Sequence, residues 1–324
     1  MSGRIACLGA GRMGRGIAIA FAFAGRDVDL VDFKQRDPSD FARFEAEARD
    51  EIDATLAIMS RIGLLDAAHI ARISARITIV PEARAGVLAE AEIIFEGLPE
   101  VVSLKHDGIR RASELAGPDP IIASTTSTFL VDELAGVVAH PGRFLNAHWL
   151  NPAFLVPLVE ISPGRLTRPD VTARLKDVLD GIGKVPVLCA PTPGYIVGRI
   201  QALALNEAAR LVEEGVATAE EIDKAIHYGF GFRYSVIGLL EFIDWGGGDT
   251  LFYASRYLEN ALQAPRYATP DIVRKNMDEG RIGMRTQRGF LDYAGMDLDD
   301  FREARLRAFA ESLRRMKLAR EPVL

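Results

Sequence analysis

The sequence predicts a doubly wound α/β sheet in the first part of the chain, followed by an all-α C-terminal domain. Three observations predict this fold. Short apolar runs alternate with helical stretches, a glycine-rich turn joins the first run to a helix, and no strong strand signal follows Pro193. Strands that alternate with helices form a largely parallel sheet covered on both faces. With 324 residues the chain also exceeds what one core usually holds, so two domains are expected.

Eight apolar runs, several rich in β-branched residues, are expected to form the sheet. They are Ile5–Leu8, Val28–Val31, Ile77–Val80, Ile93–Phe95, Ile121–Ala123, Phe144–Ala147, Leu155–Ile161 and Val185–Leu188.

The helical part should begin with one long amphipathic helix over Gly194–Glu214, which Gly215 ends. Another helix should start after Thr218, with Glu221 three residues later as a capping box. Prolines within Ala190–Pro193 stop the preceding strand. We therefore expect a first domain over residues 1–190 and a helical domain over residues 191–324.

Composition excludes several classes of partner. Hydrophobic residues make up 48% and charged residues 26%, which is ordinary for a globular protein, and a net charge of −6 gives no reason to expect nucleic acid. No run approaches the ~20 apolar residues of a membrane span, and Met1 to Leu8 lacks a signal-peptide stretch. Cys7 and Cys189 are too few for a disulfide framework, so we expect a cytoplasmic protein with Cys7 as a buried thiol.

The turn after the first strand reads Gly9-Ala-Gly11-Arg-Met13-Gly14 and opens a helix. In such a turn the first glycine permits the tight bend, the second lets the backbone approach a pyrophosphate, and the third lets helix and strand pack closely. Backbone N–H groups at the helix N-terminus then face the diphosphate. Asp32 ends the second strand, where an acid binds the ribose hydroxyls. The pattern predicts a Rossmann-type domain that binds a dinucleotide.

The choice between NAD and NADP depends on residues just beyond the second strand. Asp32 favours NAD, because a carboxylate repels a 2′-phosphate. Lys34 and Arg36 follow it and are the residues that would take that phosphate instead. We expect NAD.

Several spaced motifs in this chain resemble the L-3-hydroxyacyl-CoA dehydrogenases. They are Ser124-Thr-Thr-Ser127, His148-Trp-Leu-Asn151-Pro152, Glu160, Pro193-Gly194-Tyr-Ile-Val, Glu207–Gly215 and Gly289-Phe-Leu-Asp-Tyr293. The resemblance covers most of the chain. It implies an NAD-dependent oxidoreductase of fatty acid metabolism that acts on a CH–OH group, with its active site between the two domains and a homodimer formed through the helical domain.

The resemblance implies that Ser127, His148 and Glu160 are the catalytic residues. Oxidation of a secondary alcohol needs a base for the hydroxyl proton, and histidine exchanges protons near neutral pH. His148 follows an apolar run, at the strand end where α/β sheets bind ligands. Glu160 interrupts an apolar run and so needs a partner, although a core histidine and a surface carboxylate are the alternative. Glu160 would orient the imidazole, and Ser127 would hydrogen-bond the substrate hydroxyl.

Further residues fall at cofactor positions of the resembled family. Asn151 and Ser127 would contact the nicotinamide end, and Glu100 and Lys105 follow the fourth strand near the NAD. A solvated helix lysine is the alternative for Lys105. The other histidines show no paired spacing, and no cluster has metal-ligand spacing, so no metal is expected. These histidines are His69, His106, His140 and His227.

The sequence departs from the family in three places. Gly198 stands where the family has an asparagine that contacts substrate. Gln201 and Asn206 are the candidates for partial compensation, with ordinary polar residues of the helix as the alternative. The segment Phe41–Asp53 carries two arginines against five acidic residues, a poor surface for the CoA phosphates. Arg233 lies in a segment that resembles gulonate and carnitine dehydrogenases, which oxidise free hydroxy acids.

Arg233 is placed to clamp a substrate carboxylate, with a structural or interface arginine as the alternative. Against a free-acid substrate, Leu240–Asp244 resembles the acyl-CoA branch. Three hypotheses follow: a short-chain L-3-hydroxyacyl-CoA dehydrogenase acting on a 3-hydroxybutyryl-like substrate, a dehydrogenase of a free small hydroxy acid, and a non-catalytic crystallin-like or dinucleotide-sensing protein. The intact Ser127, His148 and Glu160 argue against the third.

Overall fold

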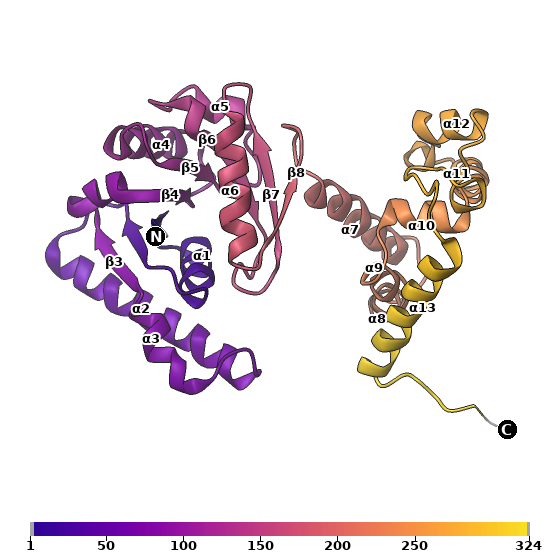
Figure 1. Cartoon of the computed structure of the whole chain (residues 1–324), viewed down its shortest axis with the longest axis horizontal. Coiled ribbons are helices and arrows are strands. Elements are labelled where there is room, and N and C mark those ends of the chain that lie inside the picture. Colours follow the sequence, from indigo (N-terminus) through magenta and orange to yellow (C-terminus); the bar gives the residue numbers. More distant parts are fainter. Residues whose placement is uncertain (1–2, 323–324) are drawn as a thin grey trace. The chain divides into compact units, whose positions relative to one another are not determined.

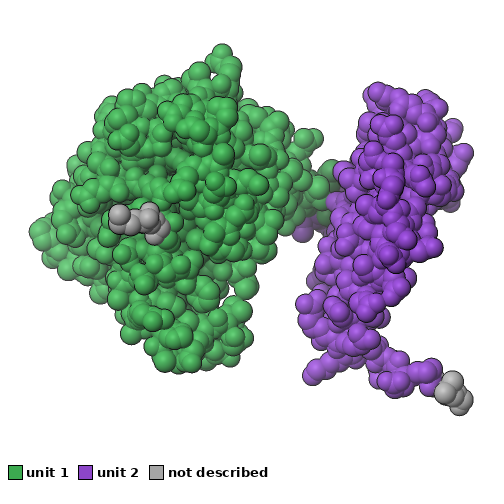
Figure 2. Space-filling model, viewed as in Figure 1, with its two compact units in different colours: residues 1–204 green, residues 205–324 purple. Residues whose placement is uncertain are grey.

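The computed structural model of the chain describes residues 3–322. The chain divides into two compact units, Met1–Ala204 and Leu205–Leu324, coloured green and purple in Figure 2. The division falls inside helix α7 (Val197–Glu213). The boundary expected from the sequence, between residues 190 and 191, lies just before that helix.

The first unit is built on one eight-stranded sheet in the order β3-β2-β1-β4-β5-β6-β7-β8 (Figure 1). The strands are β1 (Arg4–Leu8), β2 (Val28–Asp32), β3 (Ile77–Pro81), β4 (Ala91–Glu96), β5 (Ile121–Ser124), β6 (Phe144–Trp149), β7 (Leu158–Pro163) and β8 (Val185–Leu188). All eight expected strands are therefore confirmed. Strand β7 starts at Leu158 rather than Leu155, because the N–H groups of Leu155 and Val156 donate to the Pro152 carbonyl in a turn.

Strand direction and order create a switch point beside β1. Neighbouring strands are parallel except for β6 and β7, which are antiparallel. The chain moves from β1 outward to β2 and β3, and then returns to the other side of β1 as β4. Ligands of doubly wound sheets bind at the carboxyl ends of the strands at such a reversal. The sheet thus predicts a binding crevice above the ends of β1 and β4.

Helices cover both faces of the sheet. They are α1 (Arg12–Phe23), α2 (Pro38–Arg61), α3 (Ile70–Ser74), α4 (Val102–Ala116), α5 (Val131–Ala135) and α6 (Pro169–Gly181). Ile5 and Cys7 face the core shared with α1, α2 and α6, whereas Ala6 and Leu8 face the core shared with α4 and α5. This alternation follows from the two-residue period of a strand. Cys7 is fully buried, as expected, and burial raises the pKa of its thiol.

The second unit consists of helices joined by short turns (Figure 1). They are the C-terminal end of α7, α8 (Ala219–Ala225), a π-helical turn (Ile226–Gly231), α9 (Phe232–Tyr234), α10 (Leu239–Gly246), α11 (Gly248–Leu262), α12 (Asp271–Asp278) and α13 (Leu298–Arg315). Gly215 ends α7 with a φ of 70°, and the Thr218 side chain accepts a hydrogen bond from the Glu221 N–H. Both boundaries were expected from the sequence.

Asp244 connects two sequence motifs of the second unit by hydrogen bonds, Leu240–Asp244 and Gly289–Tyr293. Its buried carboxylate accepts hydrogen bonds from the backbone N–H groups of Phe290 at 2.9 Å and Leu291 at 2.8 Å, and from the Tyr293 hydroxyl at 3.2 Å. A Cβ at Gly289 would lie only 2.0 Å from the Asp244 Oδ1. The motif around Asp244, which resembles the acyl-CoA branch, therefore makes structural contacts with the glycine-containing turn.

Within the part of the chain that the structure describes, no helix has the length and apolar character needed to cross a membrane.

Candidate active site

The glycine-rich turn has the geometry that a dinucleotide requires. Gly9 has a φ of 95°, and a Cβ there would lie 2.9 Å from the Gly97 carbonyl oxygen. A Cβ at Gly14 would lie 2.0 Å from the Gly9 oxygen, so helix and strand pack too closely for a side chain. A Cβ at Gly11, in contrast, would meet nothing within 4 Å, and no side chain caps the N-terminus of α1. Met13 packs against the core, and the uncapped N-terminus of α1 is the kind of helix end that binds a diphosphate.

Asp32 lies at the end of β2 and is 6% exposed. Its Oδ2 accepts a hydrogen bond from the Nε of Arg36, whose guanidinium also lies over the Phe44 ring at 4.3 Å. Arg36, one of the two cations considered for binding a 2′-phosphate, is thus paired with Asp32, the carboxylate that would repel that phosphate.

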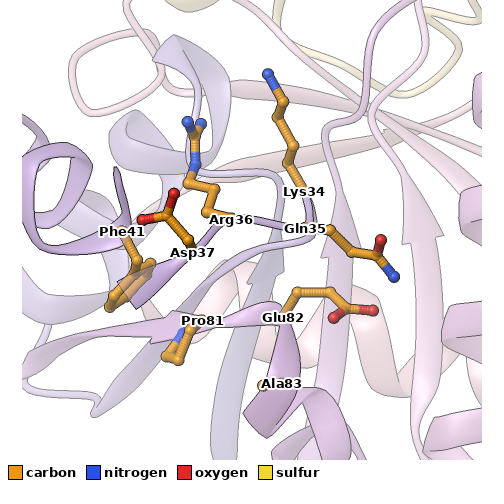
Figure 3. Close-up of a pocket in the computed structure, with 8 residues that line it drawn as sticks. All are labelled: Lys34, Gln35, Arg36, Asp37, Phe41, Pro81, Glu82 and Ala83. Atoms are coloured by element: carbon orange, nitrogen blue, oxygen red, sulfur yellow. The ribbon is translucent and has the colours of Figure 1, made fainter. Parts of the chain in front are cut away.

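A cavity of about 420 Å³ opens just beyond Asp32 (Figure 3). It is lined by Lys34, Gln35, Arg36, Asp37, Phe41, Pro81, Glu82 and Ala83. The cavity follows the strand end where the ribose is expected, so it is positioned to receive the adenosine end of a dinucleotide.

Lys105 is fully buried and makes an internal ion pair. Its Nζ lies 2.9 and 3.2 Å from the two carboxylate oxygens of Glu96 and donates to the Leu98 carbonyl at 3.2 Å. The Ser124 hydroxyl also donates to Glu96. The alternative of a solvated helix lysine is therefore wrong. Lys105 also lies next to Glu100, another residue expected near the cofactor: its Nζ is 3.8 Å from the Glu100 carboxylate.

Glu100 holds the segment that contains Ser127. One carboxylate oxygen accepts the Thr126 hydroxyl at 2.9 Å, and the other accepts the Ser127 N–H at 3.2 Å. Ser127 itself is exposed, whereas Thr126 is fully buried. Ser127 thus presents its hydroxyl from a segment whose backbone is fixed.

His148 and Glu160 lie directly opposite each other on the antiparallel strands β6 and β7. The His148 Nδ1 is 2.8 Å from the Glu160 Oε2, and the two side chains are 10% and 1% exposed. Because a carboxylate only accepts, Nδ1 donates the proton of this hydrogen bond, and in the neutral imidazole the lone pair is then on Nε2. The resemblance implies this pair, and the register of β6 and β7 brings the two side chains together.

The second oxygen of Glu160 is held by the start of α7. The N–H groups of Ile196 and Val197 both donate to Oε1 at 2.9 Å. They are presented by a turn in which Gly194 has a φ of 75° and Tyr195 a φ of 51°. A helix N-terminus favours a carboxylate at this place, and the three donors fix the orientation of Glu160.

Tyr195 and Asn146 were not among the site residues expected from the sequence. The Tyr195 ring stacks on the His148 ring at a centroid distance of 4.7 Å and an interplanar angle of 5°. Asn146 lies two residues before His148 on the same strand face and donates to the Tyr195 hydroxyl at 3.1 Å. The one signal available in the sequence was a polar residue, Asn146, inside an apolar strand.

The remaining predicted site residues lie elsewhere. Asn151 follows β6 and lines a cavity of about 300 Å³ together with Arg12 and Arg15. Gly198 is the second residue of α7, and a Cβ there would meet nothing within 4 Å, so no neighbour fills the place of the missing asparagine side chain.

Arg233 belongs to the second unit and lies in α9, directly after the π-helical turn. Its guanidinium lies 4.4 Å from the centroid of the Phe242 ring, and within residues 3–322 no carboxylate forms an ion pair with it. The described residues also include no group of three or more His, Cys, Asp or Glu side chains that could hold a metal ion.

Comparison with known proteins identifies relatives of both parts of the chain. Residues 4–192 match the NAD-binding domain of the 3-hydroxyacyl-CoA dehydrogenase family, and residues 194–293 match its C-terminal domain. A 5-formyl-3-hydroxy-2-methylpyridine 4-carboxylate 5-dehydrogenase of Mesorhizobium japonicum is 28% identical over 89% of this chain and 90% of its own length. A 3-hydroxybutyryl-CoA dehydrogenase of Bradyrhizobium diazoefficiens is 30% identical over 90% of this chain and 96% of its own. The crystal structure of a 3-hydroxyacyl-CoA dehydrogenase of Archaeoglobus fulgidus matches with a TM-score of 0.76 and 27% identity, covering 98% of this chain and all of that one.

Proposed function

Since the chain belongs to the 3-hydroxyacyl-CoA dehydrogenase family and is an NAD-dependent oxidoreductase acting on CH–OH groups, we propose that His148 is its catalytic base. The proposed reaction interconverts a short L-3-hydroxyacyl-CoA, such as 3-hydroxybutyryl-CoA, and its 3-oxo form in fatty acid metabolism. The arrangement of His148, Glu160 and the α7 N-terminus carries this proposal.

The proton pathway follows from the tautomer of His148. With Nδ1–H donated to Glu160, the lone pair of Nε2 is free to take the substrate hydroxyl proton. The Glu160 carboxylate then stabilises the imidazolium that forms. NAD, when bound, accepts the hydride from the carbinol carbon. In the reverse direction the imidazolium returns the proton to the oxygen.

Ser127 is proposed to hold the substrate oxygen. Its hydroxyl is exposed, and its backbone is fixed by Glu100. A hydrogen bond from this hydroxyl would orient the alcohol for proton and hydride transfer. Glu100, Lys105 and Asn151 remain proposed contacts of the cofactor. Gly11, Met13, Gly14 and Asp32 are proposed to bind it through the turn and the ribose.

A free small hydroxy acid is the second candidate substrate, and two observations favour it. Arg233 is exposed, and its guanidinium is stacked on Phe242 and makes no ion pair within the described residues, so its donors are available to a carboxylate. The two arginines of the segment Phe41–Asp53 already have partners: Arg49 donates to the carbonyls of Ser74 and Ile77, and Arg43 pairs with Asp40. Neither is free for the phosphates of coenzyme A.

The first experiment compares two substrates by NADH absorbance. Acetoacetyl-CoA is offered with NADH, and a panel of free 3-hydroxy acids is offered with NAD. Turnover of acetoacetyl-CoA alone supports the acyl-CoA proposal, and turnover of a free acid alone replaces it with the second candidate. Turnover of neither would favour a dinucleotide-sensing protein without this activity.

The role of Arg233 is tested by a matched pair of variants. If Arg233 binds a carboxylate, Arg233→Met should weaken binding of the free acid by about 1.5–3 kcal/mol. Arg256→Met is the control, because Arg256 also lies over a phenylalanine of the second unit, with its Cζ 5.5 Å from the Phe252 ring. An unchanged KM in the Arg233 variant would remove this role.

We also propose a homodimer formed through the helical part of the chain. Several large apolar side chains are exposed on two of its helices: Leu203, Leu205 and Val212 on α7, and Tyr253, Tyr257 and Leu262 on α11. Exposed large apolar side chains are enriched where one protein binds another. Light scattering should give twice the 35.4 kDa chain mass, and a monomer at micromolar concentration would contradict the proposal.

A further inference from the structure

Tyr195 contacts both His148, the proposed base, and the segment that carries Ser127. Its ring stacks face to face on the His148 imidazole, with 4.7 Å between centroids. Its hydroxyl, at the other end of the ring, donates to the Thr126 carbonyl oxygen at 2.8 Å. Thr126 directly precedes Ser127. One rigid side chain therefore connects the base to the serine segment.

The peptide unit between Thr126 and Ser127 is held at both ends. Its carbonyl oxygen accepts from Tyr195, and its N–H donates to Glu100 at 3.2 Å. A peptide unit is planar, so holding its two polar atoms holds the plane of the peptide and with it the position of the Ser127 Cα. The tyrosine hydroxyl supplies one of these two constraints.

The hydroxyl of Tyr195 is itself anchored. Asn146 donates to it at 3.1 Å and donates to the Phe129 carbonyl at 3.0 Å. Tyr195 is 4% exposed, and burial raises the pKa of its phenol, so the hydroxyl keeps its proton and remains a donor to Thr126. The Tyr195 hydroxyl group thus accepts one hydrogen bond, from Asn146, and donates one, to Thr126.

The backbone of Tyr195 adds a further constraint. Its φ of 51° is uncommon for a residue with a side chain, and the same turn presents the two N–H groups that hold Glu160. Phenylalanine at this position would keep the ring against His148 but would lose the connection to Thr126.

We propose that Tyr195 is a positioning residue that fixes Ser127 and His148 relative to each other through its hydroxyl. The proposal rests on the roles proposed above for Ser127 and His148. A misplacement of about 1 Å costs roughly 10²-fold in rate, so partial loosening of one constraint should cost about 10-fold.

The test is a double-mutant cycle on kcat. Tyr195→Phe should lower kcat about 10-fold, while the KM of the probe and the NADH Kd change less than about 2-fold. In a Ser127→Ala background the same substitution should cost less than about 3-fold, because the serine through which it acts is gone. The probe is acetoacetyl-CoA, or a free 3-hydroxy acid if that alone is turned over.

Tyr293→Phe is the matched control. Tyr293 is also buried, and its hydroxyl also makes a hydrogen bond, at 3.2 Å to Asp244 in the second unit. It should lower the melting temperature as Tyr195→Phe does, but leave kcat unchanged in both backgrounds.

Two outcomes would overturn the positioning role. They are an unchanged kcat in Tyr195→Phe, or equal losses in the wild-type and Ser127→Ala backgrounds. Failure of the proposed function is distinguished by the single variants, since Ser127→Ala and His148→Gln would then retain wild-type turnover.

Discussion

Replacement of Glu160 by glutamine tests the proposed proton pathway most selectively, because the two side chains have nearly the same shape. The Glu160 carboxylate accepts from three donors: the N–H groups of Ile196 and Val197 at 2.9 Å, and His148 Nδ1 at 2.8 Å. A glutamine amide has one oxygen and one NH₂ group, so it cannot accept from both sides.

The orientation of that amide follows from the cost of unmade hydrogen bonds. If the NH₂ group faced α7, two backbone N–H groups would lose their acceptor, at about 1–3 kcal/mol each. If the oxygen faces α7, only His148 must adapt, by accepting at Nδ1 and carrying its proton on Nε2. The second orientation is therefore favoured, and it removes the lone pair that would take the substrate proton.

Loss of the correct tautomer should lower kcat on the order of 10³–10⁴-fold, or roughly 4–5.5 kcal/mol. The assay is NADH absorbance with the active probe, alongside NADH binding by fluorescence and thermal melting. Glu92→Gln is the control, because Glu92 is also paired, with Arg26 and Arg174. A folded Glu160→Gln variant with kcat within 10-fold of wild type would refute the tautomer argument.

Three further predictions concern charge. Lys105→Met should destabilise the protein by about 3–5 kcal/mol in denaturant unfolding, because it leaves the Glu96 carboxylate buried and unpaired; adding Glu96→Gln should recover part of the loss, and no recovery would contradict the ion pair. Asp32→Ala should lower the preference for NAD over NADP in kcat/KM, because it removes the carboxylate that repels a 2′-phosphate, and an unchanged ratio would show that other residues discriminate. Hydrogen bonding to Arg266 lowers the pKa of Glu207 from 4.5 to about 2, so its stabilisation is fully present above pH 4.5 and is lost as the pH falls toward 2. The difference in melting temperature between wild type and Glu207→Gln should therefore shrink between pH 6 and pH 3, and a constant difference would contradict the pairing.

Much of the first unit follows from local sequence patterns. All eight strands were predicted because each is a short apolar run flanked by turn residues, and the dinucleotide turn because only glycine suits Gly9 and Gly14. His148 and Glu160 were paired through the family resemblance, which the local pattern supports because the carboxylate interrupts an apolar strand and requires a partner.

The contacts that the sequence did not indicate are non-local or involve charged residues that are buried. Tyr195 reaches Thr126 across 69 residues of chain and Asn146 across 49, and no local pattern encodes either hydrogen bond. Lys105 could be taken for a solvated helix residue because lysine is rarely buried. Its burial is explained by the ion pair with the buried Glu96 carboxylate.

The central claim, that His148 takes the substrate proton, is tested most directly by His148→Gln. The measurement is kcat by NADH absorbance with the active probe, together with the NADH Kd. The account predicts a loss of at least about 10²-fold in kcat with NADH binding unchanged, as expected when a general base is removed. Activity retained within a few-fold of wild type would contradict it.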